Sequence, residues 1–438
     1  MSGNTTARNL DVTNPWASAN ASSDVGVWVE TDNYAFMVGN IVNGWADSGN
    51  NEASGGDGLD GGDGGLINTG MALFGSDTTT TVNSNETTLL VDLGGATKAE
   101  NIGIDSSYVE ANADSLAGVM VVNENGAIGG NLVFVEANSG WNEANGGDGD
   151  TGGNGGYIDT GDAGVLVGSD VSMNDNYTLV AGDFGGNTTA ENLFVDSSYA
   201  EANTSGGTFI EVINLNDVYA VNSVEAYANT GWNTANGGSD GGEIYTGEAF
   251  LVTDVGTTVN SSTTVVAGAG GGNATASNTA VSNSYAEANA SSTGSTGVIN
   301  TNSASVETSV STAANTGEND ASGSSSGGII STGSAVNETS VSTTVNTNDT
   351  TVAVEQGNAR ASNTGVTDSS ATATAESSTT TTVTNTNDAT VVNNVSTSSN
   401  TGGNTATDGG SVSTGGAGTG VSGSTSTNTN TVNLVVGP

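Results

Sequence analysis

The sequence predicts an all-β protein, a β-solenoid (parallel β-helix) of about five tandem units of 85–92 residues without caps. A block resembling Asn-Thr-Thr-Ala-Glu-Asn recurs five times, and its copies start 92, 91, 86 and 85 residues apart, at Asn4, Ala96, Asn187, Asn273 and Asn358. Between the copies, β-branched and polar residues alternate with a period near two, which is typical of strands. A tandem period of this kind indicates units that bury their faces against their neighbours.

The composition favours strands and turns over helices. The chain has 67 glycines and 2 prolines, and it is poor in the helix formers Leu, Lys, Gln and Arg. Each unit divides into a Gly/Asp loop, a Thr-Gly step, a Val/Thr strand series and the Asn-Thr-Thr-Ala-Glu-Asn block. Asn-Thr, Asn-Gly and Gly-Gly steps interrupt these runs every few residues. We therefore expect several rungs per unit.

Two residue types recur in every unit. The glycine of the Thr-Gly step is expected where the backbone needs a positive φ or a close approach. An asparagine recurs two residues after a constant alanine, and stacked side chains that bond to the next rung would explain it. These asparagines are Asn9, Asn101, Asn192, Asn278 and Asn363.

The composition changes along the chain. Residues 1–250 form an acidic part that carries nearly all the aromatic residues, and residues 251–438 are rich in Ser, Thr and Val. The second part is expected to continue the same solenoid, because the repeat phase and the valine alternation persist. A flexible Ser/Thr-rich stalk is the alternative.

The charge limits the possible partners. The sequence holds 47 acidic residues against 3 basic ones, a formal net charge of -44, which argues against nucleic acid and against anionic membrane surfaces. No apolar run reaches the length of a membrane helix, so no membrane insertion is expected. The first residues do not resemble a secretory signal, so the chain is a processed form, uses another export route, or stays inside. The chain has no cysteine, so its composition does not indicate the redox environment in which the protein resides.

An acidic, glycine-rich loop is the strongest candidate metal site. Asp57, Asp60 and Asp63 alternate with glycine, and Asp148 and Asp150 repeat the pattern one unit later. Such spacing lets carboxylate and carbonyl oxygens converge on a hard cation such as Ca²⁺. The loop partly resembles the GGxGxD repeats of calcium-binding β-roll (RTX) proteins, although the apolar residue after the Asp is mostly missing. Solvated loops with diffuse counterions are the alternative.

An enzyme is not expected. The chain has no histidine, and Arg8, Lys98 and Arg360 are its only basic residues, whereas polysaccharide lyases and hydrolases that share the β-helix commonly use basic residues. No serine nucleophile with a base, P-loop or dinucleotide motif is present. Trp141 and Trp232 occupy the same place in successive units; they either pack a turn or form a sugar-stacking platform.

Sequons of the Asn-x-Ser/Thr type provide candidate glycan acceptors if the protein is displayed on a surface. The sequence contains twelve sequons, and the candidates among them are Asn85, Asn176, Asn187, Asn203, Asn260, Asn273, Asn289 and Asn337.

The two ends of the sequence match in phase. The candidate polymerisation ends are Asn4, Leu10 and Val12 at the head and Leu434 and Val436 at the tail. In the sequence, Leu434–Gly437 resembles residues 179–182. Open strand edges at an uncapped end act as templates, so we expect a head-to-tail homopolymer formed by strand addition. The chain resembles Gly/Asn/Thr-rich β-solenoid surface proteins of the fibre or adhesin type.

That resemblance implies a structural protomer of an extracellular or cell-surface filament or sheath, stabilised by cations. Two alternatives remain open at this point: a carbohydrate- or cell-binding adhesin or tail-fibre stalk, and a β-helical polysaccharide-active enzyme.

Overall fold

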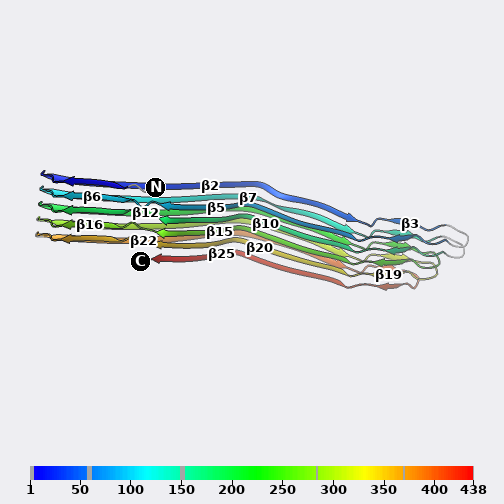
Figure 1. The fold of residues 1–438 in the computed structure, drawn as a ribbon. Coiled ribbons are helices and arrows are strands. Elements are labelled where there is room, and N and C mark those ends of the chain that lie inside the picture. The colour runs from blue at the N-terminus through cyan, green and yellow to red at the C-terminus, as the bar shows by residue number, and fades with distance from the viewer. Residues whose placement is uncertain (1–3, 57–61, 148–152, 283–284, 368–369, 438) are drawn as a thin grey trace.

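The computed structural model describes residues 4–56, 62–147, 153–282, 285–367 and 370–437. These residues form five parallel sheets of five strands each, and no helix occurs among them. The coils lie one on another from the N-terminus to the C-terminus in a long, flat stack (Figure 1). The prediction of an all-β parallel solenoid is confirmed.

Each unit supplies one strand to each of the five sheets, and we call one such pass a coil. Coil 1 comprises β1 (Thr5–Leu10), β2 (Trp16–Asp47), β3 (Glu52–Ser54), β4 (Leu66–Asn68) and β5 (Ala72–Asp92). Coil 2 comprises β6 (Ala96–Ile102), β7 (Tyr108–Asn138), β8 (Glu143–Asn145), β9 (Tyr157–Asp159) and β10 (Ala163–Asp183). Coil 3 comprises β11 (Asn187–Leu193), β12 (Tyr199–Asn229), β13 (Thr234–Asn236), β14 (Glu243–Thr246) and β15 (Ala249–Ala269).

Coil 4 comprises β16 (Ala274–Thr279), β17 (Ala286–Asn315), β18 (Asp320–Ser322), β19 (Ile329–Thr332) and β20 (Ala335–Glu355). Coil 5 comprises β21 (Ala359–Thr364), β22 (Ala371–Asn400), β23 (Thr405–Ala406), β24 (Ser411–Ser413) and β25 (Ala417–Gly437). The sheets continue without a break across residue 250, which lies inside β15.

The register shows that one unit is one coil. Thr5 pairs with Thr97, and Ala163 pairs with both Ala72 and Ala249, so the pairing distance equals the repeat length. The expectation of several rungs per unit was therefore wrong. Asparagine and glycine steps that resemble turns in the sequence do not interrupt the strands, and the long β2-type strands continue through them.

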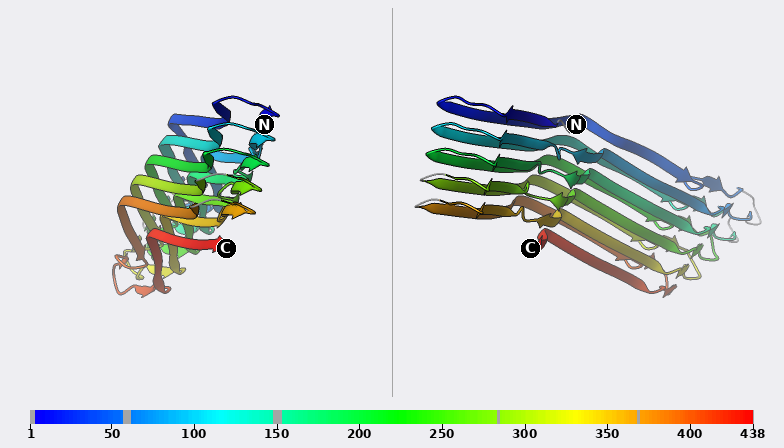
Figure 2. Two further views of the ribbon diagram at one scale, coloured as in Figure 1. Left: turned by 90° about the vertical axis from the view of Figure 1, so that its left-hand side faces the viewer. Right: turned by 60° about the vertical axis from the view of Figure 1, so that its left-hand side comes forward.

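Two layers of sheet enclose a narrow core. The long β2-type strands form one layer, and the β1-type and β5-type strands form the facing layer, as the end-on view shows (Figure 2). Val133 and Val135 of one layer pack with Val165 of the other, and alanines bring the layers together at the β1 end. The alternation seen in the sequence thus directs every second residue inward.

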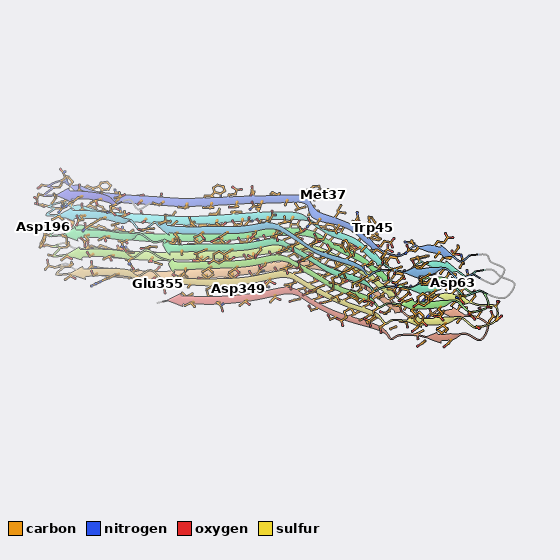
Figure 3. All side chains as sticks on the ribbon, turned by 45° about the vertical axis from the view of Figure 1, so that its right-hand side comes forward. Met37, Trp45, Asp63, Asp196, Asp349 and Glu355 are labelled. Carbon is orange, nitrogen blue, oxygen red and sulfur yellow. The ribbon has the colours of Figure 1, made fainter. Side chains whose placement is uncertain are left out.

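Differences in repeat length are confined to a few places. Met37 is an extra residue in a β-bulge between Phe36 and Val38, and it lies at the bend of the long strand (Figure 3). Elsewhere the change in repeat length falls mainly in the loop between the β3-type and β4-type strands. The paired residues Asn145 and Asn236 are 91 positions apart in the sequence, whereas the paired residues Tyr157 and Glu243 are 86 positions apart. The strand register itself is preserved.

The glycine of the Thr-Gly step is explained by close approach. A Cβ on Gly161 would lie 2.5 Å from the carbonyl carbon of Gly70, and Gly247 meets Gly161 in the same way. Neither has a positive φ. Any larger residue would force adjacent coils apart.

Candidate functional site

The recurrent asparagines form a continuous ladder through all five coils. The Nδ2 of Asn9 donates to Oδ1 of Asn101 at 2.9 Å, and Asn101 donates in turn to Asn192 at 2.9 Å. The ladder continues through Asn278 to Asn363. Asn101 and Asn192 are 0% exposed, and the Nδ2 of Asn101 also reaches the carbonyl of Glu110 at 2.6 Å. The predicted ladder is confirmed.

Three more buried ladders span all five coils in the same direction, each coil donating to the next one toward the C-terminus. They run through Asn33, Asn125, Asn216, Asn302 and Asn387; Asn51, Asn142, Asn233, Asn319 and Asn404; and Asn83, Asn174, Asn260, Asn346 and Asn428. The last set has φ between 53° and 56° and also donates to backbone carbonyls of the facing layer, as from Asn83 to Gly126 at 2.8 Å. Asparagine tolerates this left-handed conformation better than most residues.

One ladder at the end of the long strands has the opposite direction. Asn229 donates to Asn138 at 2.9 Å, and Asn138 donates to the carboxylate of Asp47 at 3.0 Å. Asn315 and Asn400 continue it toward the C-terminus. Each ladder therefore presents donors at one end of the stack and acceptors at the other.

The first and last coils leave their outer strand edges unpaired among the described residues. Strands β1 to β5 pair only with coil 2, and β21 to β25 pair only with coil 4. The inward residue Leu434 is 50% exposed, whereas its register partners toward the middle of the stack, Val352, Val266 and Val180, are 0% exposed. An unpaired strand edge is a template for pairing with another chain.

The predicted polymerisation residues fall on these end faces. The backbone N–H of Ala96 donates to Oδ1 of Asn4, Val12 packs at the edge of the core, and Leu10 is exposed on the outer surface. At the other end, Leu434 and Val436 lie in inward columns of β25. The register aligns Leu434 with Val180, one residue later than the sequence alignment suggested.

The end faces are in phase. Strand β1 begins and β25 ends at a similar position along the flat body, at opposite ends of the stack (Figure 1). Gly437 is in register with Glu355, and Thr5 is in register with Thr97. A second copy displaced along the stack would place its β1 to β5 where a sixth coil would lie.

A stripe of tyrosine, glutamate and asparagine runs along the outer face of the β2-type sheet. The rings of Tyr108, Tyr199 and Tyr285 are stacked, with centroids 5.0 Å apart in each adjacent pair. The hydroxyl of Tyr108 donates to Glu201 at 3.1 Å. Burial and then the charge of Glu201 raise the pKa of Tyr108 to about 12, and the same two causes raise the pKa of Tyr199.

Of the predicted calcium ligands, Asp57, Asp60, Asp148 and Asp150 lie outside the described residues. Asp63 lies near the tip of the fold (Figure 3), and its carboxylate accepts a hydrogen bond from Nδ2 of Asn154 at 2.9 Å. It lines a shallow cavity together with Asp240 and Glu243. Within the described ranges, no cluster of three or more His, Cys, Asp or Glu has the geometry of a metal site.

The sequons divide into buried and accessible positions. Asn176, Asn260 and Asn337 are buried, and Asn85 donates into the inter-layer network, so the folded coil does not present these four amides to a glycan. Asn187, the first residue of β11, and Asn273, directly before β16, are exposed. Asn203 and Asn289 are partly buried in a ladder on the outer face.

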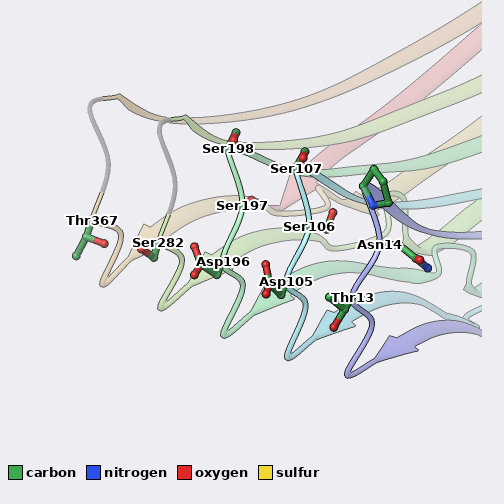
Figure 4. A pocket seen from close by; sticks show the side chains of 11 residues that line it. Thr13, Asn14, Asp105, Ser106, Ser107, Asp196, Ser197, Ser198, Ser282 and Thr367 are labelled. Atoms are coloured by element: carbon green, nitrogen blue, oxygen red, sulfur yellow. The ribbon is translucent and has the colours of Figure 1, made fainter.

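A polar groove of about 660 Å³ runs along the turns between the β1-type and β2-type strands (Figure 4). Asp105 and Asp196 stack there through backbone bridges, with Thr13 and Ser282 on either side. The sequence alone had suggested no function for these turns. The groove is open, and two of the described residues that line it, Asp105 and Asp196, carry carboxylates.

Comparison with known proteins found no matching family model, no matching curated protein and no matching solved structure. Among the described residues, no helix has the length and apolar character needed to cross a membrane.

Proposed function

We propose that this chain is the structural protomer of a filament or sheath, in which copies stack head to tail by strand addition. The observation that carries the proposal is that each end face consists of one strand from each of the same five sheets. The first coil of one copy could therefore continue the register of the last coil of another copy. A contact between two different faces that does not close on itself produces an open filament.

The ladders give the junction a direction. Asn363 would donate to Asn9 of the next copy, as each asparagine of that ladder donates to the following coil. The other three buried ladders would continue across the junction in the same way. A head-to-head contact would instead oppose acceptors to acceptors, so the ladders favour a polar filament.

Apolar columns would also continue across the junction. Val383 of the last coil occupies the column of Val29, and Leu434 occupies the column of Leu89. Stacking would bury these half-exposed side chains, and burial of apolar surface stabilises the contact. Strand pairing would satisfy the edge N–H and C=O groups at the same time.

Cations would reduce the repulsion between copies. With a net charge of -44, every stacked copy adds a large negative charge, and only three basic residues offset it within the chain. Divalent cations such as Ca²⁺ would gather near the carboxylates of Asp63, Asp240 and Glu243, which line one cavity at the tip, and would screen their charge. We place this filament outside the cell, where three Lys and Arg leave few sites for trypsin-like proteases.

Deletion of residues 1–12 tests the proposal, because it removes β1 from one end face and leaves the other coils intact. The full chain is expected to form uniform fibres in electron micrographs, and the deletion variant is expected to sediment as a folded monomer. The control is Asp32→Asn, a change on the outer surface of the same coil that should leave fibres in place. Fibres formed by the deletion variant, or single rods formed by the full chain, would refute end-to-end stacking.

A further inference from the structure

Two tryptophans occupy a turn position that disfavours them. Trp141 and Trp232 have φ of 62° and 63°. The same position holds Asn50, Glu318 and Gly403 in the other coils, and a bulky side chain is a backbone outlier there. Because asparagine and glycine fill this position at lower backbone cost, the turn itself does not require tryptophan, and strain of this kind is concentrated at functional sites.

The stacking of the two rings leaves one aromatic face open. Their centroids are 5.0 Å apart and their planes differ by 5°, so Trp232 covers one face of Trp141. The opposite face is turned toward coil 1, where the smaller Asn50 holds the equivalent position. A cavity of about 340 Å³ lies at this place, and Trp45 borders it together with Trp141. We call this cavity the tryptophan slot.

Besides the two tryptophans, the slot is lined by Ala46, by the two amides of Asn50 and Asn138, and by two carboxylates. Asp47 and Glu136 line it, and the ion pairs of the described residues engage only Glu100 and Glu191. The carboxylate of Asp47 is held in place by Nδ2 of Asn50 at 2.8 Å and by Nδ2 of Asn138 at 3.0 Å. The two neighbouring amides thus direct donors at Asp47, and the slot presents aromatic surface and acceptor oxygens to a ligand.

We propose that the tryptophan slot binds an organic cation that carries an alkylated ammonium group. Aromatic faces attract such cations electrostatically, and quaternary ammonium groups are weakly hydrated enough to enter an aromatic site. The fixed carboxylates of Asp47 and Glu136 add charge complementarity. Metal cations such as Ca²⁺ prefer shells of oxygen ligands, which the indole walls do not supply. A neutral sugar would need donors as well as acceptors.

Calorimetric titration of the full chain with choline, under conditions in which it is monomeric, tests this assignment. Choline is expected to bind several-fold more tightly than its neutral tert-butyl analogue, since Trp45 and Trp141 are 65% and 51% exposed and a cation–π contact there is only partly desolvated. Trp141→Asn, which copies the residue of coil 1, should weaken binding about tenfold without loss of fold. Glu136→Gln should weaken it several-fold and reduce its dependence on salt.

The matched control is Trp28→Thr. Trp28 is exposed on the same sheet outside the slot, and the last coil carries Thr382 in its column. This variant should bind choline like the unaltered chain. The proposal is overturned if choline does not bind, if the neutral analogue binds equally well, or if Trp141→Asn has no effect. Binding of a neutral oligosaccharide that Trp141→Asn abolishes and Glu136→Gln leaves unchanged would assign the slot to sugars instead.

Discussion

The amide nitrogen of Asn138 donates to the carboxylate of Asp47 at 3.0 Å, and Asp47 is the terminal acceptor of this ladder. At the other end, Oδ1 of Asn400 accepts the backbone N–H of Gly402 at 3.0 Å. In a head-to-tail stack, Asp47 of the next copy would face Asn400 at a position where every internal coil has an asparagine donor. An ionised carboxylate cannot donate, so the junction has one mismatched pair.

Asp47→Asn should therefore promote assembly at neutral pH, because an asparagine restores the donor and removes a charge. Light scattering at neutral pH measures the extent of assembly of the variant and of the unaltered chain. Asp32→Asn removes an equal charge from the same coil without changing a ladder, and equal promotion by this control would show that only net charge matters.

Removal of a central ladder residue should destabilise the fold. Asn192 accepts from Asn101 at 2.9 Å and donates to Asn278 at 2.9 Å and to the carbonyl of Glu201 at 2.7 Å. Asn192→Ala leaves buried polar groups without partners, which costs about 1–3 kcal/mol in the free energy of unfolding. Urea denaturation should show a lower midpoint, while Asn394→Ala on the outer surface should stay within about 0.5 kcal/mol of the unaltered chain.

The tyrosine stripe predicts alkaline instability. The pKa of Tyr108 is raised to about 12, chiefly by burial and then by Glu201. Because the pKa in the folded state lies above the ordinary value near 10, the neutral phenol stabilises the fold below pH 10, and this stabilisation is lost as the pH rises through 12. Tyrosinate absorbance and circular dichroism should change together in this window. Tyr108→Phe should make the loss of stability with pH less steep; an unchanged profile would contradict the prediction.

Deletion of residues 188–273 should give a folded four-coil protein. The pairing of Thr188 with Ala274 shows that this segment spans one full coil, so its removal rejoins strands in register. Circular dichroism should keep its strand signal per residue and unfolding should remain cooperative. A deletion of half that length would set facing layers against each other and should not fold. Folding of the half deletion would contradict the rule of one unit per coil.

Calcium should stabilise the acidic tip loops if the carboxylates there act as ligands. Chelation with EDTA at low ionic strength is then expected to lower the unfolding temperature, and added Ca²⁺ should restore it more effectively than Na⁺ at equal ionic strength. Asp148→Asn combined with Asp150→Asn should reduce this sensitivity. An unfolding temperature that does not respond to chelation would remove the calcium hypothesis.

Sequence reasoning reached the fold because the repeat phase and the alternation survive in every unit. The Asn9 column was also predictable, since an inward asparagine that recurs at one position must find its partner in the next coil. The Thr-Gly step required close approach, and Gly161 shows that requirement against Gly70.

The coil count per unit was not predictable, because Asn83 and its equivalents resemble turn residues. The structure places them in the left-handed region inside long strands, where their side chains bridge the two layers. The tryptophan slot was also hidden, since its walls come from a strand end and a turn of different coils. Only the recurrence of tryptophan at a turn position was visible, and it indicated packing as readily as binding.

The concentration of most length changes in the tip loops has a practical consequence for engineering. The loop between Asn236 and Glu243 of coil 3 is five residues shorter than the loop between Asn145 and Tyr157 of coil 2. Both loops join a β3-type strand to a β4-type strand, and the strands on either side stay paired in register. Foreign peptides inserted there would be displayed in a row along one rim, at the roughly 4.8 Å pitch of neighbouring strands. The molecule would then serve as a regularly spaced scaffold for multivalent presentation.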